Sequence, residues 1–248
     1  MSEPVMLANM MAQSIPKDCA SSSNLELDAI ARQERLRYWP EFWWRWWSRC
    51  EIPPIHREVI RCSRPFAALD SRGGALDGVI ATLRKRKGSL CLWGPVGSGK
   101  TLLATSALYA AAYDHALSLT NWFPCPEPPS YRFAATPHLL QAIRNTYGSD
   151  GSAEAVIDRY AFCRLLVLDD IGAESPTDWV RDVLYQIIDT RYCHKLPTIL
   201  TSNLPIAKLE SRLSDRIADR IVEMCRGEVI RLNVSSYRLQ GITREEAT

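Results

Sequence analysis

The segment from Gly94 to Thr101 constrains this chain more than any other part of its sequence. It matches the pattern G-x-x-x-x-G-K-[ST]. A predicted strand at 89–93, apolar after Ser89, precedes it and a helical pattern at 100–115 follows it, so the motif joins a predicted strand to a predicted helix. In this context the motif predicts a loop that binds the phosphates of a nucleoside triphosphate, ATP with Mg²⁺.

Each part of the predicted loop has an expected task. Its glycines let backbone N–H groups wrap the phosphates, and Lys100 is expected to reach the β- and γ-phosphates. The Thr101 hydroxyl is expected to bind Mg²⁺. The predicted nucleotide-binding residues of the loop are Gly94, Pro95, Val96, Gly97, Ser98, Gly99, Lys100 and Thr101.

A second motif follows the apolar stretch 165–168, where two carboxylates, Asp169 and Asp170, stand side by side. Ligands of parallel sheets bind at the carboxyl ends of the strands, and these two residues are placed at such an end. Asp169 is expected to hold Mg²⁺, and Asp170 to orient or deprotonate the attacking water. The alternative is a strand that simply enters a polar loop, which the upstream phosphate loop disfavours.

Two later features fit the same site less specifically. A buried strand at 198–201 is followed by Asn203, whose amide is suited to positioning the attacking water, although Asn is also a common turn residue. Arg216 and Arg220 lie four residues apart and would share one face of a helix. They either pair with neighbouring acidic residues or reach the nucleotide of a neighbouring subunit.

Apolar stretches and helical patterns alternate from residue 89 onward, which predicts an α/β fold with a parallel sheet flanked by helices. Before that, residues 25–48 have a mostly helical pattern containing five tryptophans. Trp39, Trp43, Trp46 and Trp47 share one face of it, which either packs on the protein's own core or docks a partner. The predicted organisation is a helical, Trp-rich region at 1–50, a linker at 51–66 and an ATP-binding domain at 67–248.

Charge and cysteine content narrow the remaining possibilities. The formal net charge is only +2, so any contact with DNA is expected to be local. None of the eight cysteines forms a Cys-x-x-Cys pair, and no run of about 20 apolar residues predicts a membrane span. We therefore expect a soluble, cytoplasmic protein without a membrane partner.

The order of phosphate loop, acidic strand, Asn-ended strand and late arginines resembles that of AAA+ ATPases. Within that class, the sequences LLVLDDIGAE (165–174), DWVR (178–181) and PTILTSNL (197–204) resemble the DnaC/DnaI replicative helicase loaders and the related IstB transposition helpers. The sequence VSSYR at 234–238 is also similar to the closing motif of that group. The resemblance covers about 51–238, and residues 1–50 match no family.

The resemblance implies further roles for residues of this chain. Asn203 corresponds to the first sensor, and Arg238 to a second sensor that touches the γ-phosphate. Arg220 corresponds to the arginine finger, and Arg216 is the competing candidate for that role. Asp170 stands where most AAA+ proteins carry Glu, which is expected to slow hydrolysis, and Glu174 is an alternative base. Only 45 residues follow Asn203, too few for a full C-terminal helical lid of roughly 60 residues, as in the loaders.

The expected function is that of an ATPase that loads a hexameric replicative helicase onto single-stranded DNA, binding the helicase through its N-terminal region and self-assembling in ATP. The resemblance implies DNA contacts from Arg144, Arg159 and Tyr147. Hydrolysis is expected to be slow and controlled by DNA or a partner. The main competing function is an IstB-like transposition helper acting on duplex DNA. A small-molecule kinase, which Asn203 and the missing lid disfavour, and a non-hydrolysing adaptor also compete.

Overall fold

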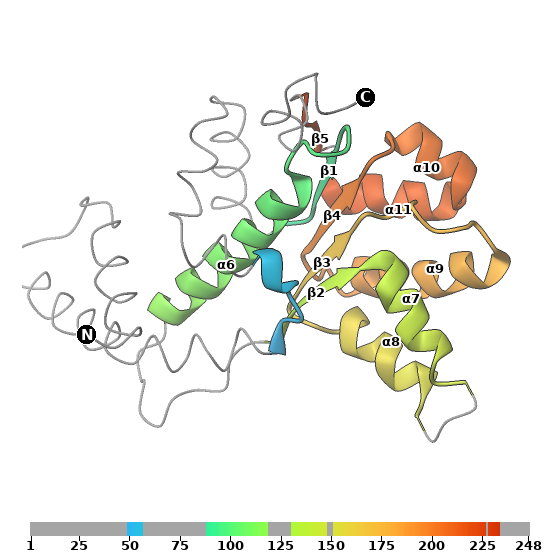
Figure 1. The fold of residues 1–248 in the computed structure, drawn as a ribbon, viewed down its shortest axis with the longest axis horizontal. Coiled ribbons are helices and arrows are strands. Elements are labelled where there is room, and N and C mark those ends of the chain that lie inside the picture. Colours follow the sequence, from blue (N-terminus) through green and yellow to red (C-terminus); the bar gives the residue numbers. More distant parts are fainter. Residues whose placement is uncertain (1–48, 57–87, 119–129, 148–150, 227, 234–248) are drawn as a thin grey trace, which may run out of the picture.

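The computed structural model describes residues 49–56, 88–118, 130–147, 151–226 and 228–233, and these build one five-stranded sheet with helices (Figure 1). The sheet order is β2-β3-β4-β1-β5, and every neighbouring pair of strands is parallel. The expected parallel α/β sheet is therefore confirmed. The strands are β1 (Leu90–Trp93), β2 (Tyr131–Ala135), β3 (Leu165–Asp169), β4 (Thr198–Ser202) and β5 (Val229–Arg231).

The register brings the ends of the strands to one edge of the sheet. Trp93, the last residue of β1, pairs with Ser202 of β4 on one side and with Arg231 of β5 on the other. Ala135 at the end of β2 pairs with Asp169 at the end of β3. The segments that follow β1, β3 and β4 therefore begin at the same edge, where ligands of such sheets bind.

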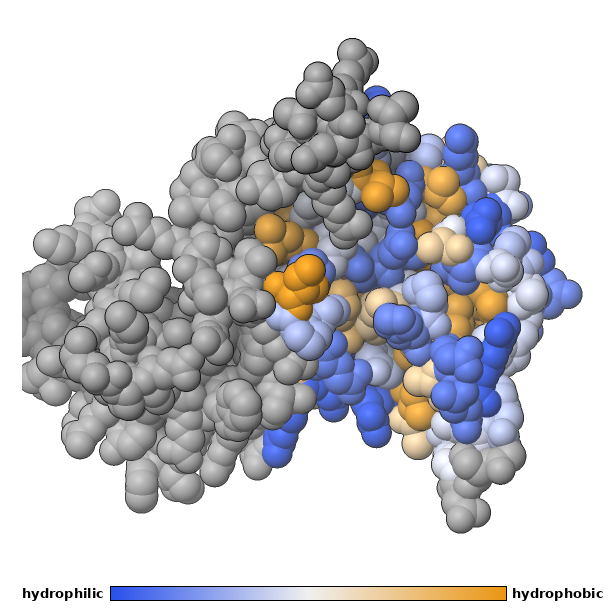
Figure 2. Space-filling model, viewed as in Figure 1, coloured by the Kyte–Doolittle hydropathy of each residue, from blue (hydrophilic) through white to orange (hydrophobic). Residues whose placement is uncertain are grey.

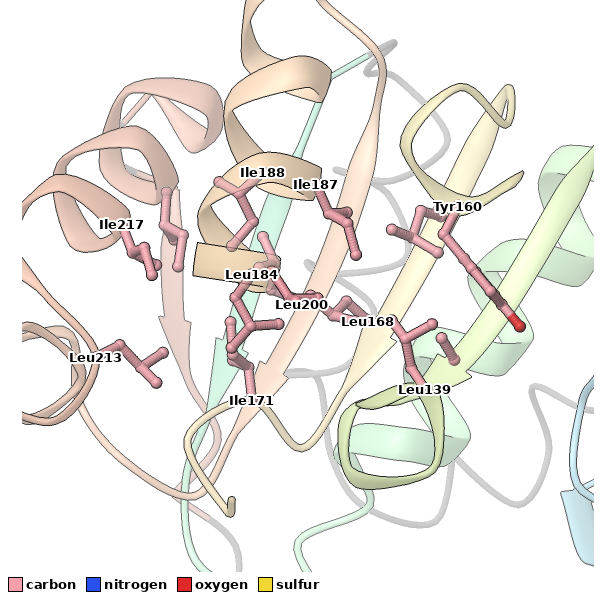
Figure 3. Packing of buried hydrophobic residues seen from close by; sticks show 14 of the residues in the cluster. Leu139, Tyr160, Leu168, Ile171, Leu184, Ile187, Ile188, Leu200, Leu213 and Ile217 are labelled. Carbon is pink, nitrogen blue, oxygen red and sulfur yellow. The ribbon is translucent and has the colours of Figure 1, made fainter. Parts of the chain in front are cut away.

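Helices cover both faces of this sheet (Figure 1). Leu90 and Leu92 of β1 pack in the core cluster on the side of α6, and Cys91 between them packs in the cluster on the opposite side, as strand alternation requires. Figure 3 shows Leu168 and Leu200 of the sheet facing Leu184 and Ile187. One face carries α6 (Lys100–Ser118), and the other carries α7 (Thr136–Arg144), α8 (Ala153–Ala161), α9 (Asp178–Cys193), α10 (Ile206–Arg212) and α11 (Asp215–Cys225).

Local sequence explains where the helices begin. The hydroxyls of Ser152, Thr177 and Ser214 accept hydrogen bonds from the N–H three residues later and so cap α8, α9 and α11. Pro137 instead lies in the first turn of α7, where its fixed φ suits the helix. This helix therefore begins at Thr136, and it ends in a turn over 145–147.

The helix α10 was not predicted from the sequence, because its seven residues are too few to show a clear period. It packs on α11 through the buried Leu209. Both helices connect β4 to β5, so they belong to the core of the sheet and not to a lid.

The short segment 49–56 packs against the sheet. Cys50 and Ile52 are fully buried in the core cluster beside α6, and the backbone N–H of Phe133 donates to the Cys50 carbonyl at 2.8 Å. The Glu51 carboxylate accepts a hydrogen bond from the Tyr160 hydroxyl. The predicted domain boundaries at 50 and 66 stay a prediction, and the tryptophan-rich segment lies outside the described residues.

At the edge where the strands begin, Arg191 of α9 is completely buried. Its guanidinium donates to the Thr198 hydroxyl at 2.7 Å and to the Pro197 carbonyl at 2.6 Å. It also donates to the carbonyls of Tyr160, Ala161 and Cys163 at 2.9, 3.1 and 2.9 Å. One side chain thus joins the end of α8 to the starts of β3 and β4, and no carboxylate among the described residues pairs with it.

The coloured part of the surface in Figure 2 is mostly hydrophilic, with apolar residues in small groups between the charged ones. This pattern is usual for a surface exposed to water. Within the described part of the chain, no helix combines the length and the apolar character that crossing a membrane would require.

Candidate nucleotide site

The loop after β1 has the backbone geometry of a phosphate-binding loop. Gly97 and Gly99 have φ angles of 82° and 88°, in the left-handed region that glycine tolerates best. The loop starts against the residue that follows β5, since a Cβ on Gly94 would lie 2.4 Å from the carbonyl oxygen of Leu232. It ends at Lys100, where α6 begins, so the free N–H groups of the first helical turn face the space enclosed by the loop.

The Lys100 ammonium lies at the centre of this loop and is buried. It donates to the carbonyl oxygens of Gly94 and Pro95, both at 2.9 Å, and to the side-chain oxygen of Asn203 at 2.8 Å. The last contact joins residues 103 positions apart in the chain. The structure therefore brings the predicted lysine and the predicted sensor asparagine into direct contact.

Asp169 lies beside Thr101, as the sequence predicted. The Thr101 hydroxyl donates to Asp169 Oδ2 at 3.1 Å, and the Thr201 hydroxyl donates to Asp169 Oδ1 at 2.7 Å. A third threonine, Thr136 of α7, donates to the Asp169 backbone carbonyl at 2.8 Å. Burial raises the pKa of Asp169 above its ordinary value, and the hydrogen bonds from Thr201 and Thr101 oppose that shift.

Asp170 leaves the end of β3 in the left-handed conformation, with a φ of 58°. Its carboxylate accepts a hydrogen bond from the Asn203 amide at 2.6 Å, and its backbone N–H donates to the Thr201 hydroxyl at 2.9 Å. Asn203 therefore bridges Lys100 and Asp170, and four of the predicted residues form one connected group: Lys100, Asn203, Asp170 and, through Thr201, Asp169.

These residues fit ATP and Mg²⁺ by their chemistry. A glycine loop at a helix N-terminus with a central lysine suits a polyphosphate. The Thr101 hydroxyl and the Asp169 carboxylate are oxygen donors of the kind Mg²⁺ prefers, and the burial of Asp169 favours a cation beside it. No cluster of three or more His, Cys, Asp or Glu side chains in the described ranges offers a separate metal site.

The remaining acidic candidate, Glu174, has a different arrangement. It is buried, and both carboxylate oxygens accept from the backbone N–H of Gly172 at 3.1 Å. Burial raises the pKa of this carboxyl group. Glu174 thus closes the loop that follows Asp170, and its expected role as an alternative base stays a prediction.

The two arginines of α11 differ in their surroundings. Arg220 donates to Asp189 of α9 at 2.9 Å and to Glu223 at 3.3 Å, and it stacks 4.3 Å above the Tyr192 ring. Arg216 is exposed and forms no ion pair with any described residue. Their expected roles at a neighbouring subunit stay predictions, and Arg238 lies outside the described residues.

The residues predicted to contact DNA separate into two places. The Arg144 guanidinium lies 4.5 Å above the ring of Trp179, whose indole N–H donates to the Tyr147 hydroxyl at 3.1 Å. Tyr147 is 60% exposed. These three residues, Arg144, Tyr147 and Trp179, form the aromatic cluster. Arg159 lies elsewhere, 3.9 Å from Glu51.

Sequence reasoning missed the threonines around Asp169 and the part played by Trp179. Thr201 and Thr136 have no motif of their own, and the only signal was a Thr directly before Ser202 and Asn203 at a strand end. Trp179 belonged to a stretch noted for its resemblance, but nothing in the spacing indicated that it would lie beside Tyr147.

Comparison with known families identifies this arrangement. A family model described as "IstB-like ATP binding protein" matches residues 79–246, which include the loop, the strands β1, β3 and β4 of the site, and α11. This chain belongs to the IstB-like ATP-binding protein family. The resemblance noted in the sequence is thereby confirmed.

Relatives of this IstB-like protein come from several contexts. It is 28% identical over 166 residues to XkdC of a phage-like element in Bacillus subtilis, covering 63% of this chain and 56% of that protein. It is 26% identical to a putative ATP-binding protein of insertion sequence IS232 from Bacillus thuringiensis, covering 75% and 70%. It is 27% identical to the replicative helicase loader DnaC of Escherichia coli, covering 71% and 68%.

A solved structure supports the fold of the IstB-like chain. The crystal structure of DnaI aligns with 74% of this chain and 94% of its own length, with a TM-score of 0.54 and 23% identity. The five-stranded parallel sheet flanked by helices is thus the P-loop AAA+ fold. The relatives include both a helicase loader and an insertion-sequence protein, so they support an ATPase of this class without choosing between the two.

Proposed function

We propose that this IstB-like protein is a Mg²⁺-dependent ATPase that loads a hexameric replicative helicase onto single-stranded DNA in the cytoplasm. The ATP-binding assignment comes from the family. Hydrolysis, the helicase partner and the single-stranded substrate are parts of the proposal.

The proposed chemistry uses the connected group around Asn203. Lys100 and the loop N–H groups bind the phosphates, and Thr101 and Asp169 would hold Mg²⁺, which supplies charge neutralisation on the phosphate oxygens. Asp170 accepts a proton from the attacking water, and Asn203, in contact with both Lys100 and Asp170, places that water between them. The side chain of Asp170 is shorter than the Glu of most AAA+ proteins, which is consistent with slow turnover.

The observation that carries the preference for single-stranded DNA is the aromatic cluster. Exposed aromatic rings stack on unpaired bases, whereas bases of a duplex are already stacked on each other. The 60% exposed Tyr147, with Arg144 held over the Trp179 ring beside it, combines such a surface with a positive charge. Arg159, which lies near Glu51, is a weaker candidate for a phosphate contact.

The DNA part of the proposal is tested by measuring the binding of fluorescent single-stranded and duplex oligonucleotides to the full-length protein with ATP. The double variant Arg144→Ala, Tyr147→Ala should bind single strands about 10-fold more weakly, since a stacked base contributes about 1–3 kcal/mol. Arg164→Ala removes an exposed arginine at the opposite edge of the sheet and is the matched control. Unchanged single-strand affinity in the double variant would contradict the assignment.

The helicase part is tested by co-purification with the host's replicative helicase in ATP and Mg²⁺. The full chain should be used, since Cys50 and Ile52 belong to the core and a truncation at residue 50 would remove part of it. Trp43→Ala with Trp47→Ala changes the tryptophan face predicted from the helical period, and Trp44→Ala, which lies off that face, is the control. Association lost only in the first variant supports the proposed docking region.

The second candidate, an IstB-like transposition helper, is favoured by the insertion-sequence relative. It predicts ATP-dependent assembly on duplex DNA and no association with the helicase. The two experiments above therefore separate the candidates.

Self-assembly in ATP is a further part of the proposal, with Arg220 or Arg216 reaching the nucleotide of the next subunit. Mixing Lys100→Ala, which keeps both arginines, with Arg220→Ala, which keeps the nucleotide loop, should restore hydrolysis that neither variant shows alone. The same mixture with Arg216→Ala decides between the two arginines. If neither mixture regains activity, an arginine acting between subunits is contradicted.

A further inference from the structure

We infer that Thr201 is a positioning residue for two carboxylates of the nucleotide site, that of Asp169, which would bind the metal, and that of Asp170, the proposed base. This inference rests on the proposed Mg²⁺-dependent function. Thr201 is the fourth residue of β4, next to the strand that ends at Asp169, and only 1% of it is exposed. The family resemblance assigned it no role.

The directions of its hydrogen bonds are fixed by the chemistry of the groups. A backbone N–H only donates, so the Asp170 N–H at 2.9 Å must donate to a lone pair of the Thr201 oxygen. The single hydroxyl proton is then left for Asp169 Oδ1 at 2.7 Å, which as a carboxylate oxygen accepts it. One hydroxyl therefore connects the two acidic residues.

The contact with Asp169 fixes the orientation of its carboxylate. With Oδ1 held by Thr201, Oδ2 faces Thr101 at 3.1 Å, the residue expected to share the metal. The backbone of Asp169 is held separately by Thr136. Thr101 holds Oδ2 and Thr136 holds only the backbone carbonyl, so among these three residues Thr201 alone holds Oδ1.

The contact with Asp170 stabilises an uncommon backbone conformation. A residue other than glycine is rarely found at a φ of 58° without local support. Thr201 supplies that support twice, through its hydroxyl to the Asp170 N–H and through its backbone carbonyl to the Ile171 N–H at 2.9 Å. This turn directs the Asp170 carboxylate to the Asn203 amide.

Other buried hydroxyls of the chain show that this arrangement is specific. The hydroxyls of Thr105 and Ser106 in α6 donate to the carbonyls of Thr101 and Leu102, four residues earlier, as is common in helices. That of Thr198 donates to the carbonyl of Leu196. In contrast, the Thr201 hydroxyl donates to a carboxylate of the nucleotide site, so its loss should affect the function of the site more than the stability of the fold.

The test is Thr201→Val in the full-length protein, which keeps the branched shape and removes the hydroxyl. The affinity for a fluorescent ATP analogue is measured with Mg²⁺ and with EDTA. In the variant, the Mg²⁺-dependent gain in affinity should fall about 10-fold, as expected for a lost hydrogen bond to a charged group, while the affinity in EDTA stays close to that of the unaltered protein. Thr201→Ser restores the hydroxyl and should restore the gain.

Ser106→Ala is the matched control, because it removes an equally buried hydroxyl that does not touch the carboxylates. If the valine variant is unstable, Thr201→Cys gives the same comparison with a much weaker donor. A wild-type-like Mg²⁺ gain in Thr201→Val, or an equal loss of affinity with and without Mg²⁺, would overturn the inference. An unaltered protein that gains nothing from Mg²⁺ would also overturn the proposed function, so the two failures are distinguishable.

Discussion

Charged side chains have different partners at the edge of the sheet where the strands begin and at the edge where they end. At the edge where the strands begin, the guanidinium of Arg191 is completely buried and donates to one hydroxyl and four backbone carbonyls that hold α8, β3 and β4 together. At the edge where the strands end, Lys100, Asp169, Asp170 and Asn203 contact mainly one another and the phosphate loop.

This difference indicates what each edge is for. The partners of Arg191 are backbone groups whose hydrogen bonds would otherwise be lost inside the protein, so the charge there serves stability. The charged groups around Asn203 lie at the ends of the strands or on the segments that follow them, where a ligand can replace their present contacts. We therefore expect substitutions at the first edge to change the free energy of unfolding, and substitutions at the second to change nucleotide binding and hydrolysis.

The largest expected effect is that of Arg191→Ala. It leaves several buried carbonyls without a donor and creates a cavity, which should lower the free energy of unfolding by about 3–5 kcal/mol. Urea denaturation measures this, with the exposed Arg164→Ala as the control at within about 0.5 kcal/mol. A loss below about 1 kcal/mol for Arg191→Ala would contradict the claim that the buried charge at this edge stabilises the fold.

The next effect is that of Lys100→Ala, which should weaken ATP binding about 100-fold or more through the loss of a charge-assisted contact to the phosphates. Its free energy of unfolding without nucleotide should change less than that of Arg191→Ala, because Lys100 donates to two backbone carbonyls and one side chain, whereas Arg191 donates to four carbonyls and a hydroxyl. Calorimetric titration and urea denaturation give the two values. A stability loss as large as that of Arg191→Ala would contradict the division between the edges.

Asn203→Ala is expected to lower the rate of ATP hydrolysis about 10- to 100-fold, because it removes the group that bridges Lys100 and Asp170. The affinity for ATP should change less than about 3-fold, since Asn203 is not part of the loop. Steady-state phosphate release and nucleotide titration separate these quantities. Asn145→Ala, at an exposed asparagine after α7, is the control, and a loss of affinity equal to the loss of rate would contradict the bridging role.

The smallest effect is expected for Asp189→Asn, which weakens the ion pair with Arg220. Both side chains are about one third exposed, so the free energy of unfolding should fall by less than about 1 kcal/mol, and less at high salt. Urea denaturation at low and high salt checks this. A salt-independent loss of several kcal/mol would show that this ion pair stabilises the fold as strongly as the buried Arg191 is expected to.

Much of the fold and the centre of the site could be predicted because they depend on local patterns. The apolar stretch predicted at 165–168 lies in the strand 165–169, and the buried strand predicted at 198–201 lies in the strand 198–202. Helix α10 escaped prediction because seven residues show little period.

The contacts within the site could not be predicted, because they join residues far apart in the chain. Lys100 meets Asn203 only after β1 and β4 become neighbours in the sheet. The left-handed turn at Asp170 depends on a hydroxyl from the next strand. No sequence motif marks Arg191 in the last turn of α9, and its role depends on the packing of α8 and two strands around it.

The close packing of Gly94 against Leu232, the residue after β5, has a consequence for how such a protein diverges. The carbonyl of Leu232 leaves no room for a side chain there, whatever the loop binds. The first glycine of the loop is thus required by the neighbouring backbone, whereas the proposed task of Lys100 depends on the phosphates. A descendant that kept the fold but no longer used ATP would be expected to lose the lysine early and to retain the glycine, so a surviving glycine without the lysine would mark ancestry and not activity.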